Sequence, residues 1–283
     1  MKNVFLIAAI ILSVLACKEP MKEVDILPDG TQFKLVAFGE NMDSIQLTDY
    51  LLCYITIADT LGDTIHYVPN YPYFVEYYKE SPLYSAMNQL HLGDSFHLII
   101  PEKSLFEAFG FDRLNENSEK LLELRIRALD FITEENVENK LLEGLEKRLN
   151  NEDKDIQNYL SKQPDREAYI KEKGIYIKSE IKSTLEPIKY GDIVTLEYDG
   201  QFLDGYVFDS KKGDKSLEIT YGMSDQVISG IEQGINGLSE GESVKIILPS
   251  HIAFGAEGSV KGIVPPYTPV AYKIFVKKVT HTN

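Results

Sequence analysis

The chain has 283 residues, of which 43% are hydrophobic and 26% are charged, and its formal net charge is −15. This length and apolar content suffice for a sizeable core and favour two domains over one. The acidic balance disfavours nucleic acid and anionic membrane surfaces as electrostatic partners.

The first residues have the pattern of a secretory signal. An apolar run over residues 4–12 follows Lys2, is too short to span a membrane, and is followed by small residues. The segment 14–17, VLAC, is similar to a bacterial lipobox. We therefore expect residues 1–16 to be a signal peptide and Cys17 to be lipidated, which would anchor the chain in the cell envelope, at the outer membrane or on the periplasmic side. An ordinary signal peptide that contains a cysteine is the alternative.

The mature chain is predicted to begin with a polar tether over residues 17–30. If Cys17 is acylated, Cys53 has no partner and no disulfide forms. Cys53 lies in the apolar run LLCYITI, so we expect it to be a buried small hydrophobic residue.

The amino-terminal half reads as strands separated by turns. Residues 49–58 are rich in β-branched and aromatic side chains and predict a buried strand, followed by a turn at DTLGD. Residues 95–100 and 121–132 are further strand candidates.

Two parts of the chain are similar to each other. LHLGDSFHLIIP at 90–101 aligns with LSEGESVKIILP at 238–249, Gly62 aligns with Gly205, and AFG follows in both copies. Residues 31–132 are therefore predicted to be a degenerate copy of the carboxy-terminal domain. Chance likeness between two β-rich segments is the alternative.

The segment 67–78, YVPNYPYFVEYY, carries six aromatic residues, five of them tyrosine. A core strand with a packed loop explains this cluster. An adhesive surface for extended peptides is the alternative, because tyrosine offers a large contact area with a polar end.

Residues 133–173 are charged and predict a helical linker. Val137, Leu141, Leu145 and Leu149 recur at four-residue spacing and form one apolar stripe, and further helical segments are expected at 155–160 and 165–171. The stripe fits a spacer that packs on one domain or a helix that forms a homodimer.

Residues 174–283 contain strand patterns before and after one short helix. An edge strand is expected at 174–178, a half-buried strand at 193–200, a helix at 227–235 and strands at 217–221, 244–248 and 270–279. This order predicts an α+β domain in which an antiparallel sheet curls around a helix. With the degenerate copy and the linker, the expected fold is two such domains joined by a helix.

The motifs of this second domain follow one another in a fixed order: YDG at 198–200, DG at 204–205, FDS at 208–210, VISGIEQGI at 227–235, LSEGE at 238–242, AFG at 253–255 and GIVPP at 262–266. Together they resemble FKBP-type peptidyl-prolyl isomerases over residues 174–279. The resemblance implies a prolyl isomerase that acts on proline-containing polypeptides and uses neither a cofactor nor a metal.

The family's site residues can be carried over position by position. The implied catalytic residues are Tyr198, Phe208, Asp209 and Phe254. The implied substrate-binding residues are Leu217, Val227, Ile228, Ile231, Ile263 and Tyr272. In the family the acid at Asp209 hydrogen-bonds the tyrosine at Tyr198, and the backbone N–H at Ile228 donates to a substrate carbonyl.

Three positions depart from the family pattern. Ile231 stands where the pocket floor is often tryptophan, Phe254 replaces a tyrosine, and Leu217 replaces an aromatic wall. The first copy has Ile55, Ile65 and His66 at the pocket positions and lacks the GIVPP loop. These losses leave a second hypothesis open, in which the chain is a non-catalytic peptide-binding or assembly module of the envelope.

Overall fold

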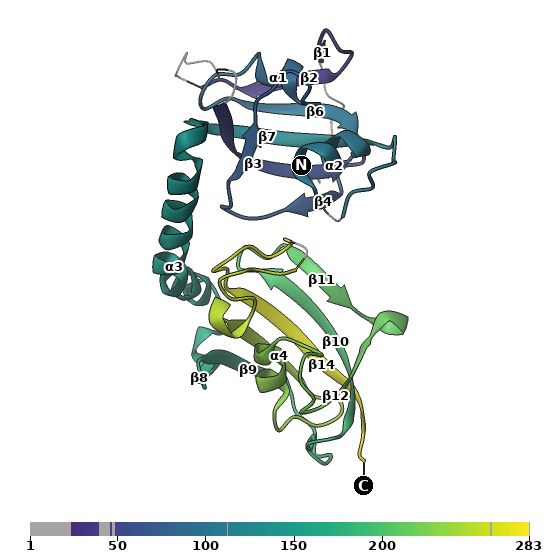
Figure 1. Ribbon diagram of the computed structural model, residues 1–283. Helices are drawn as coiled ribbons and strands as arrows, with labels where there is room; N and C mark the ends of the chain where they lie inside the picture. The colour runs from purple at the N-terminus through teal and green to yellow at the C-terminus, as the bar shows by residue number, and fades with distance from the viewer. Residues whose placement is uncertain (1–23, 40–45, 47–48, 112, 261, 283) are drawn as a thin grey trace, which may run out of the picture.

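The computed structural model describes residues 24–39, 46, 49–111, 113–260 and 262–282. The predicted signal peptide and Cys17 lie outside the described residues. Two antiparallel sheets, one above the other in Figure 1, are connected along one side by a long helix, α3. None of the helices in the described part of the chain is both long enough and apolar enough to cross a membrane.

Within the described residues, the first sheet has seven strands in the order β1-β2-β6-β7-β3-β4, with β5 also paired to β3. They are β1 (Asp25–Ile26), β2 (Gln32–Ala37), β3 (Asp49–Asp59), β4 (Thr64–Tyr67), β5 (Tyr73–Glu76), β6 (Ser95–Pro101) and β7 (Leu121–Thr133). Two short helices, α1 (Tyr84–Met87) and α2 (Glu102–Phe109), lie in the connections on either side of β6. Alternate residues of β3 are buried, as expected of a strand with one face on the core.

The second sheet also has seven strands within the described residues, in the order β11-β10-β14-β13-β9-β8, with β12 paired to β10. They are β8 (Ile170–Glu172), β9 (Ile175–Ile181), β10 (Ile193–Phe202), β11 (Val207–Lys211), β12 (Leu217–Thr220), β13 (Ser243–Leu248) and β14 (Val270–Thr280). One helix, α4 (Ser229–Ile235), packs against the concave side of this sheet through buried Ile231 and Ile235. The expectation of two α+β domains joined by a helix is confirmed.

The two sheets have the same topology, since β1 to β7 take the positions of β8 to β14 one for one. Equivalent hydrogen bonds close the same turn in each. Gly62 N–H donates to Asp59 O and Gly205 N–H to Phe202 O, both at 2.9 Å. Both glycines have positive φ, +90° and +97°, a conformation that favours glycine. This correspondence supports the alignment of Gly62 with Gly205.

A second pair of turns matches in side-chain detail. Asp94 Oδ2 accepts from His91 N–H at 2.9 Å, and Glu242 Oε2 accepts from Ser239 N–H at 3.1 Å. These carboxylates occupy the aligned position of LGD and GE in the two copies. Each stabilises the turn that precedes the strand β6 or β13, so the acid after the glycine has a structural role in both domains.

The linker is one continuous helix, α3 (Val137–Ser161). Its second half buries Ile156 and Leu160 against Ile247 and Ala271 of the second domain. Its first half leaves Leu141 and Leu149 of the predicted stripe exposed, together with the neighbouring Leu142. The helix therefore belongs to the second domain at one end and bridges to the first domain at the other (Figure 1).

Two expectations near the start of the second domain are wrong. The predicted helical segment at 165–171 is a 3₁₀ turn (Arg166–Ala168) followed by strand β8. The predicted edge strand at 174–178 is an inner strand, β9, because β8 covers its outer side. The cause is the turn Lys173-Gly174, whose two residues both have positive φ and so form a tight hairpin connection.

Candidate active site

The predicted pocket residues come from different elements and meet in one hydrophobic cluster of the second domain. Tyr198 lies on β10, Phe208 and Asp209 on β11, Leu217 on β12, Ile231 on α4 and Tyr272 on β14. Val227 and Ile228 precede α4, and Phe254 and Ile263 lie in the long connection between β13 and β14. The apolar members all belong to this cluster or pack against it. The curled sheet thus brings residues up to 74 positions apart together.

Aromatic rings form one side of the pocket. The ring centroids of Phe208 and Tyr272 are 5.9 Å apart in an edge-to-face arrangement, and those of Phe208 and Phe254 are 6.2 Å apart. Tyr198 packs on Tyr272 at 5.7 Å. Edge-to-face contacts of this kind hold rings in fixed orientations, which gives the pocket a rigid wall.

The pocket residue Asp209 accepts a hydrogen bond from a tyrosine. The Tyr198 hydroxyl donates a hydrogen bond of 2.8 Å to Asp209 Oδ2. Burial, together with the hydrogen bond to Asp209 and the charge of Asp209, raises the pKa of Tyr198. Burial also raises the pKa of Tyr272. Both hydroxyls therefore stay protonated at neutral pH, and Tyr198 remains a donor to Asp209.

Ile228 is placed as a backbone donor. It lies directly before α4 with φ −62° and ψ 147°, and its carbonyl accepts from the N–H groups of Ile231 and Glu232. Its own N–H donates to no acceptor in the described part of the chain. Since a backbone N–H is a strong donor, a bound peptide carbonyl would satisfy it.

Sequence reasoning missed two residues that shape the pocket. Phe202 is fully buried, and its ring lies 5.0 Å from that of Phe208. A Cβ added at Gly200 would lie 2.7 Å from Tyr272 Cε1 and 3.0 Å from Phe208 Cε2, so only glycine fits between these rings. The alternation along β10, which buries Tyr198, Gly200 and Phe202 in turn, was the signal that could have identified both.

The equivalent pocket of the first domain is filled by its own side chains. His66, the counterpart of Asp209, stacks on Phe111 with ring centroids 4.1 Å apart, and its Nε2 lies 2.8 Å from the Tyr73 hydroxyl. Phe109 stacks on Phe111 at 5.3 Å. His66 is only 3% exposed. Burial, with Arg113 nearby, lowers the pKa of His66 to about 4.

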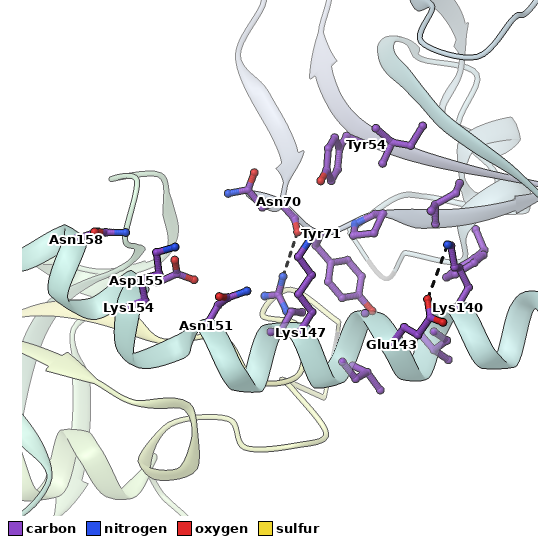
Figure 2. A pocket seen from close by; sticks show the side chains of 18 residues that line it. Tyr54, Asn70, Tyr71, Lys140, Glu143, Lys147, Asn151, Lys154, Asp155 and Asn158 are labelled. Carbon is purple, nitrogen blue, oxygen red and sulfur yellow. Dashed lines mark hydrogen bonds and ion pairs between the residues drawn. The ribbon is translucent and has the colours of Figure 1, made fainter. Parts of the chain in front are cut away.

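A separate cleft of about 650 Å³ lies between α3 and the first domain. Figure 2 shows Tyr54, Asn70 and Tyr71 facing Lys147 and other residues of the helix. None of the predicted site residues lines this cleft. Among the described residues, no group of three or more His, Cys, Asp or Glu side chains is arranged to hold a metal ion.

The second domain matches known proteins. The family model described as FKBP-type peptidyl-prolyl cis-trans isomerase matches residues 185–277. An FK506-binding protein of Neisseria meningitidis serogroup C is 36% identical over 90 residues, which are 31% of this chain and 81% of that relative. The chain belongs to the FKBP-type peptidyl-prolyl cis-trans isomerase family.

Other relatives of this FKBP-family chain are longer than the matched region. Peptidyl-prolyl cis-trans isomerase FKBP11 of Bos taurus is 38% identical over 73 residues, 26% of this chain and 36% of the relative. A probable FKBP-type isomerase FkpA of Neisseria meningitidis serogroup B is 34% identical over 115 residues, 36% of this chain and 41% of the relative. The chain thus spans well under half the length of these two relatives.

Among solved structures, the chain is similar to FkpA from Escherichia coli. The likeness has a TM-score of 0.45 and 21% identity, and it covers 52% of this chain and 68% of that chain. The three FKBP domains of wheat FKBP73 give a TM-score of 0.36 at 14% identity, over 92% of this chain and 99% of that chain.

Proposed function

We propose that the second domain catalyses cis–trans isomerisation of X–Pro bonds in polypeptides, by non-covalent stabilisation of the twisted amide. The observation that carries this proposal is the acid Asp209, held by Tyr198 beside an aromatic pocket. Rotation about the amide has a barrier of about 18–20 kcal/mol because it breaks resonance. The rotation requires no nucleophile, and the motifs of the second domain offer apolar and aromatic side chains and the acid Asp209 for this chemistry.

Each part of the pocket has a task in this mechanism. The apolar walls of Phe208, Phe254 and Tyr272 take the proline ring and exclude water. The twisted amide has less charge separation than the planar one, so a dry pocket favours it. The N–H of Ile228 donates to a carbonyl of the substrate and holds the chain beside the pocket while the amide rotates.

The test is the exchange rate of an Ala-Leu-Pro-Phe peptide measured by exchange NMR. The wild-type chain should accelerate exchange, and Asp209→Ala should lose most of the acceleration while the fold is kept. If neither the wild-type chain nor a variant with an opened pocket raises the rate above its uncatalysed value, the isomerase proposal fails.

A non-catalytic peptide-binding module is the second candidate function. Two observations favour it. The pocket floor is Ile231 and the loop residue is Phe254, which has no hydroxyl, and the first domain's pocket is filled by Tyr73, Phe109 and Phe111. Suppression of aggregation of an unfolded client, retained in Asp209→Ala while exchange is lost, would show that binding and catalysis are separate functions.

We also propose that the chain acts on exported proteins in the cell envelope, on the outer membrane or periplasmic side, held to the membrane by lipid at Cys17. The support is the VLAC pattern at 14–17, which lies outside the described residues. Acyl chains would anchor an acidic chain that charge alone would not hold. Metabolic labelling with palmitate should mark the wild-type chain, and Cys17→Ser should abolish both the label and membrane fractionation.

We also propose that the chain forms a homodimer through α3. Its support is the exposed leucines of the first half of the helix, Leu141, Leu142 and Leu149. Light scattering should give twice the chain mass, and Leu142→Glu should restore the monomer mass. A monomer mass for the wild type over the working concentration range contradicts it.

A further inference from the structure

The first domain reaches into the hydrophobic cluster of the second through one loop. This loop, residues 67–72 with the sequence YVPNYP, starts at the last residue of β4 and leads to β5. Val68 is only 3% exposed, although it belongs to a loop, and it is part of the same cluster as Tyr198, Phe208 and Tyr272. Tyr71 packs against this cluster as well. The first domain therefore contributes an apolar side chain to the cluster that contains the predicted pocket.

The near side of the loop is fixed to the strand that carries the pocket acid. The Tyr67 ring makes an edge-to-face contact with Tyr206, with centroids 5.4 Å apart. Arg113 Nη2 donates a hydrogen bond of 2.7 Å to Phe208 O, and its Nη1 donates to Ile65 O at 3.2 Å. One arginine thus joins the strand leading into the loop, β4, to β11.

The other end of the loop is linked, through Arg148, to the last residue of the GIVPP motif. Arg148 of α3 donates from Nη1 to Asn70 O at 3.2 Å and from Nε to Pro266 O at 3.1 Å. Its guanidinium also lies over the Tyr71 ring, 5.1 Å from the centroid. Figure 2 shows Asn70 and Tyr71 on the cleft side of the loop, opposite the helix. The loop therefore spans from one rim of the pocket to the other.

The contact is of a kind that can open. The second half of α3 is held to the second domain by buried Ile156 and Leu160 and by Glu152, whose carboxylate accepts from the N–H and hydroxyl of Ser250. The first half borders the open cleft. The first domain contacts the second through the loop and through Arg113 and Arg148. Domains commonly move relative to each other unless a large hydrophobic interface joins them.

We propose that loop 67–72 occludes the isomerase pocket within the same chain. Polypeptide clients gain access when the first domain moves away from the second. The proposal rests on the proposed function of the second domain, and it adds a regulation of that site. Val68 occupies apolar space that a client side chain would otherwise fill. Because only the open fraction of molecules binds a client, the apparent affinity of the pocket is reduced by that fraction.

The test compares the full chain with Val68→Asp, which would bury a carboxylate in the pocket cluster and so disfavours the closed form. Two readouts are made with the Ala-Leu-Pro-Phe peptide: the acceleration of exchange and the affinity from NMR titration. We expect both to rise on the order of tenfold, as for a closed form that holds about nine-tenths of the molecules. Val36→Asp is the matched control, because Val36 is an exposed valine of the same domain, and it should leave both readouts at the wild-type values.

A second variant that should favour the open form keeps the proposal testable if Val68→Asp does not fold. Arg113→Ala removes both carbonyl contacts, and its matched control is Arg127→Ala, which changes an exposed arginine of β7. If the peptide affinity is equal in wild type, Val68→Asp and Arg113→Ala, the loop does not occlude the pocket. That result overturns the occlusion proposal and leaves the isomerase proposal intact. A rise in affinity with no acceleration of exchange in any chain supports occlusion by the loop and overturns the proposal that the domain is catalytic. A fall in affinity in both variants overturns the occlusion proposal, since the loop would then be part of the binding surface.

Discussion

Arg113 of the first domain donates a hydrogen bond of 2.7 Å to the carbonyl oxygen of Phe208 in the second. The same guanidinium donates at 3.2 Å to the carbonyl oxygen of Ile65, which is the counterpart of Phe208 in the repeat. The two pocket-bearing hairpins therefore face each other across one side chain. The degenerate copy kept the scaffold and lost an open pocket, and it packs against the pocket that remained.

Tyr198→Phe should weaken the pocket without unfolding it. The substitution removes the hydroxyl that donates to Asp209 at 2.8 Å and leaves the ring packing on Tyr272. We expect a loss of about 1 kcal/mol in stability and roughly fivefold in kcat/KM. Urea unfolding and peptide exchange measure the two effects. Tyr176→Phe, which removes a hydroxyl that accepts a hydrogen bond from Gln157 away from the pocket, should change neither.

Gly200→Ala should disrupt the aromatic wall. The added methyl would lie 2.7 Å from Tyr272 Cε1, closer than carbon atoms approach in folded proteins, so the rings must move. Overpacking of this kind costs about 1–3 kcal/mol, and isomerase activity should fall with it. The control is Gly144→Ala within α3, where an added methyl meets nothing within 4 Å. This change should stabilise the chain by about 0.5–1 kcal/mol, and destabilisation there would contradict the helix assignment.

His66 should make the first domain sensitive to acid. Its folded pKa of about 4 lies below the ordinary value of 6.5 because the ring is buried beside Arg113. The unfolded chain therefore takes up a proton first, and stability is lost as the pH falls from about 6.5 towards 4. The expected loss is about 2 kcal/mol at pH 5. Hydrogen exchange of β4 at pH 7 and pH 5 should show this loss in the wild type and not in His66→Gln. An equal loss in both chains would mean that another group titrates.

Glu152→Ala should loosen α3 from the second domain. The Glu152 carboxylate is buried and accepts hydrogen bonds from the backbone N–H and the hydroxyl of Ser250. Removing it leaves a buried N–H without a partner, at a cost of about 1–3 kcal/mol. Hydrogen exchange near Ser250 should rise, whereas Glu146→Ala on an exposed turn of the same helix should leave it unchanged. Equal protection in both variants would contradict the anchoring role.

Local patterns in the sequence predicted much of the second domain. The alternation along β10 places Tyr198 on the core face, and the glycine at 205 marks the turn before Phe208. The internal alignment predicted the repeat, because the same turns need the same glycine and acid in both copies. Strand β8 was missed, since three charged or exposed residues carry no alternation and depend on the Lys173-Gly174 turn.

Contacts between distant parts of the chain could not be predicted. The burial of His66 depends on Phe111, which is 45 positions away and follows no motif. The docking of Val68 depends on the direction of α3, which no residue of the loop encodes. The tyrosine-rich segment 67–78 did indicate an adhesive surface as one alternative, and the structure shows part of it, Tyr67 to Tyr71, against the second domain.

The measurement that tests the central claim most directly is the exchange rate of the Ala-Leu-Pro-Phe peptide with wild type, Asp209→Ala, and Val68→Asp in parallel. If the second domain is an isomerase, the wild type should accelerate exchange or, if the pocket is tightly closed, Val68→Asp should do so. That acceleration should be lost when Asp209→Ala is added. Uncatalysed exchange with both wild type and Val68→Asp, or full acceleration that survives Asp209→Ala, would contradict the assignment of catalysis to this pocket.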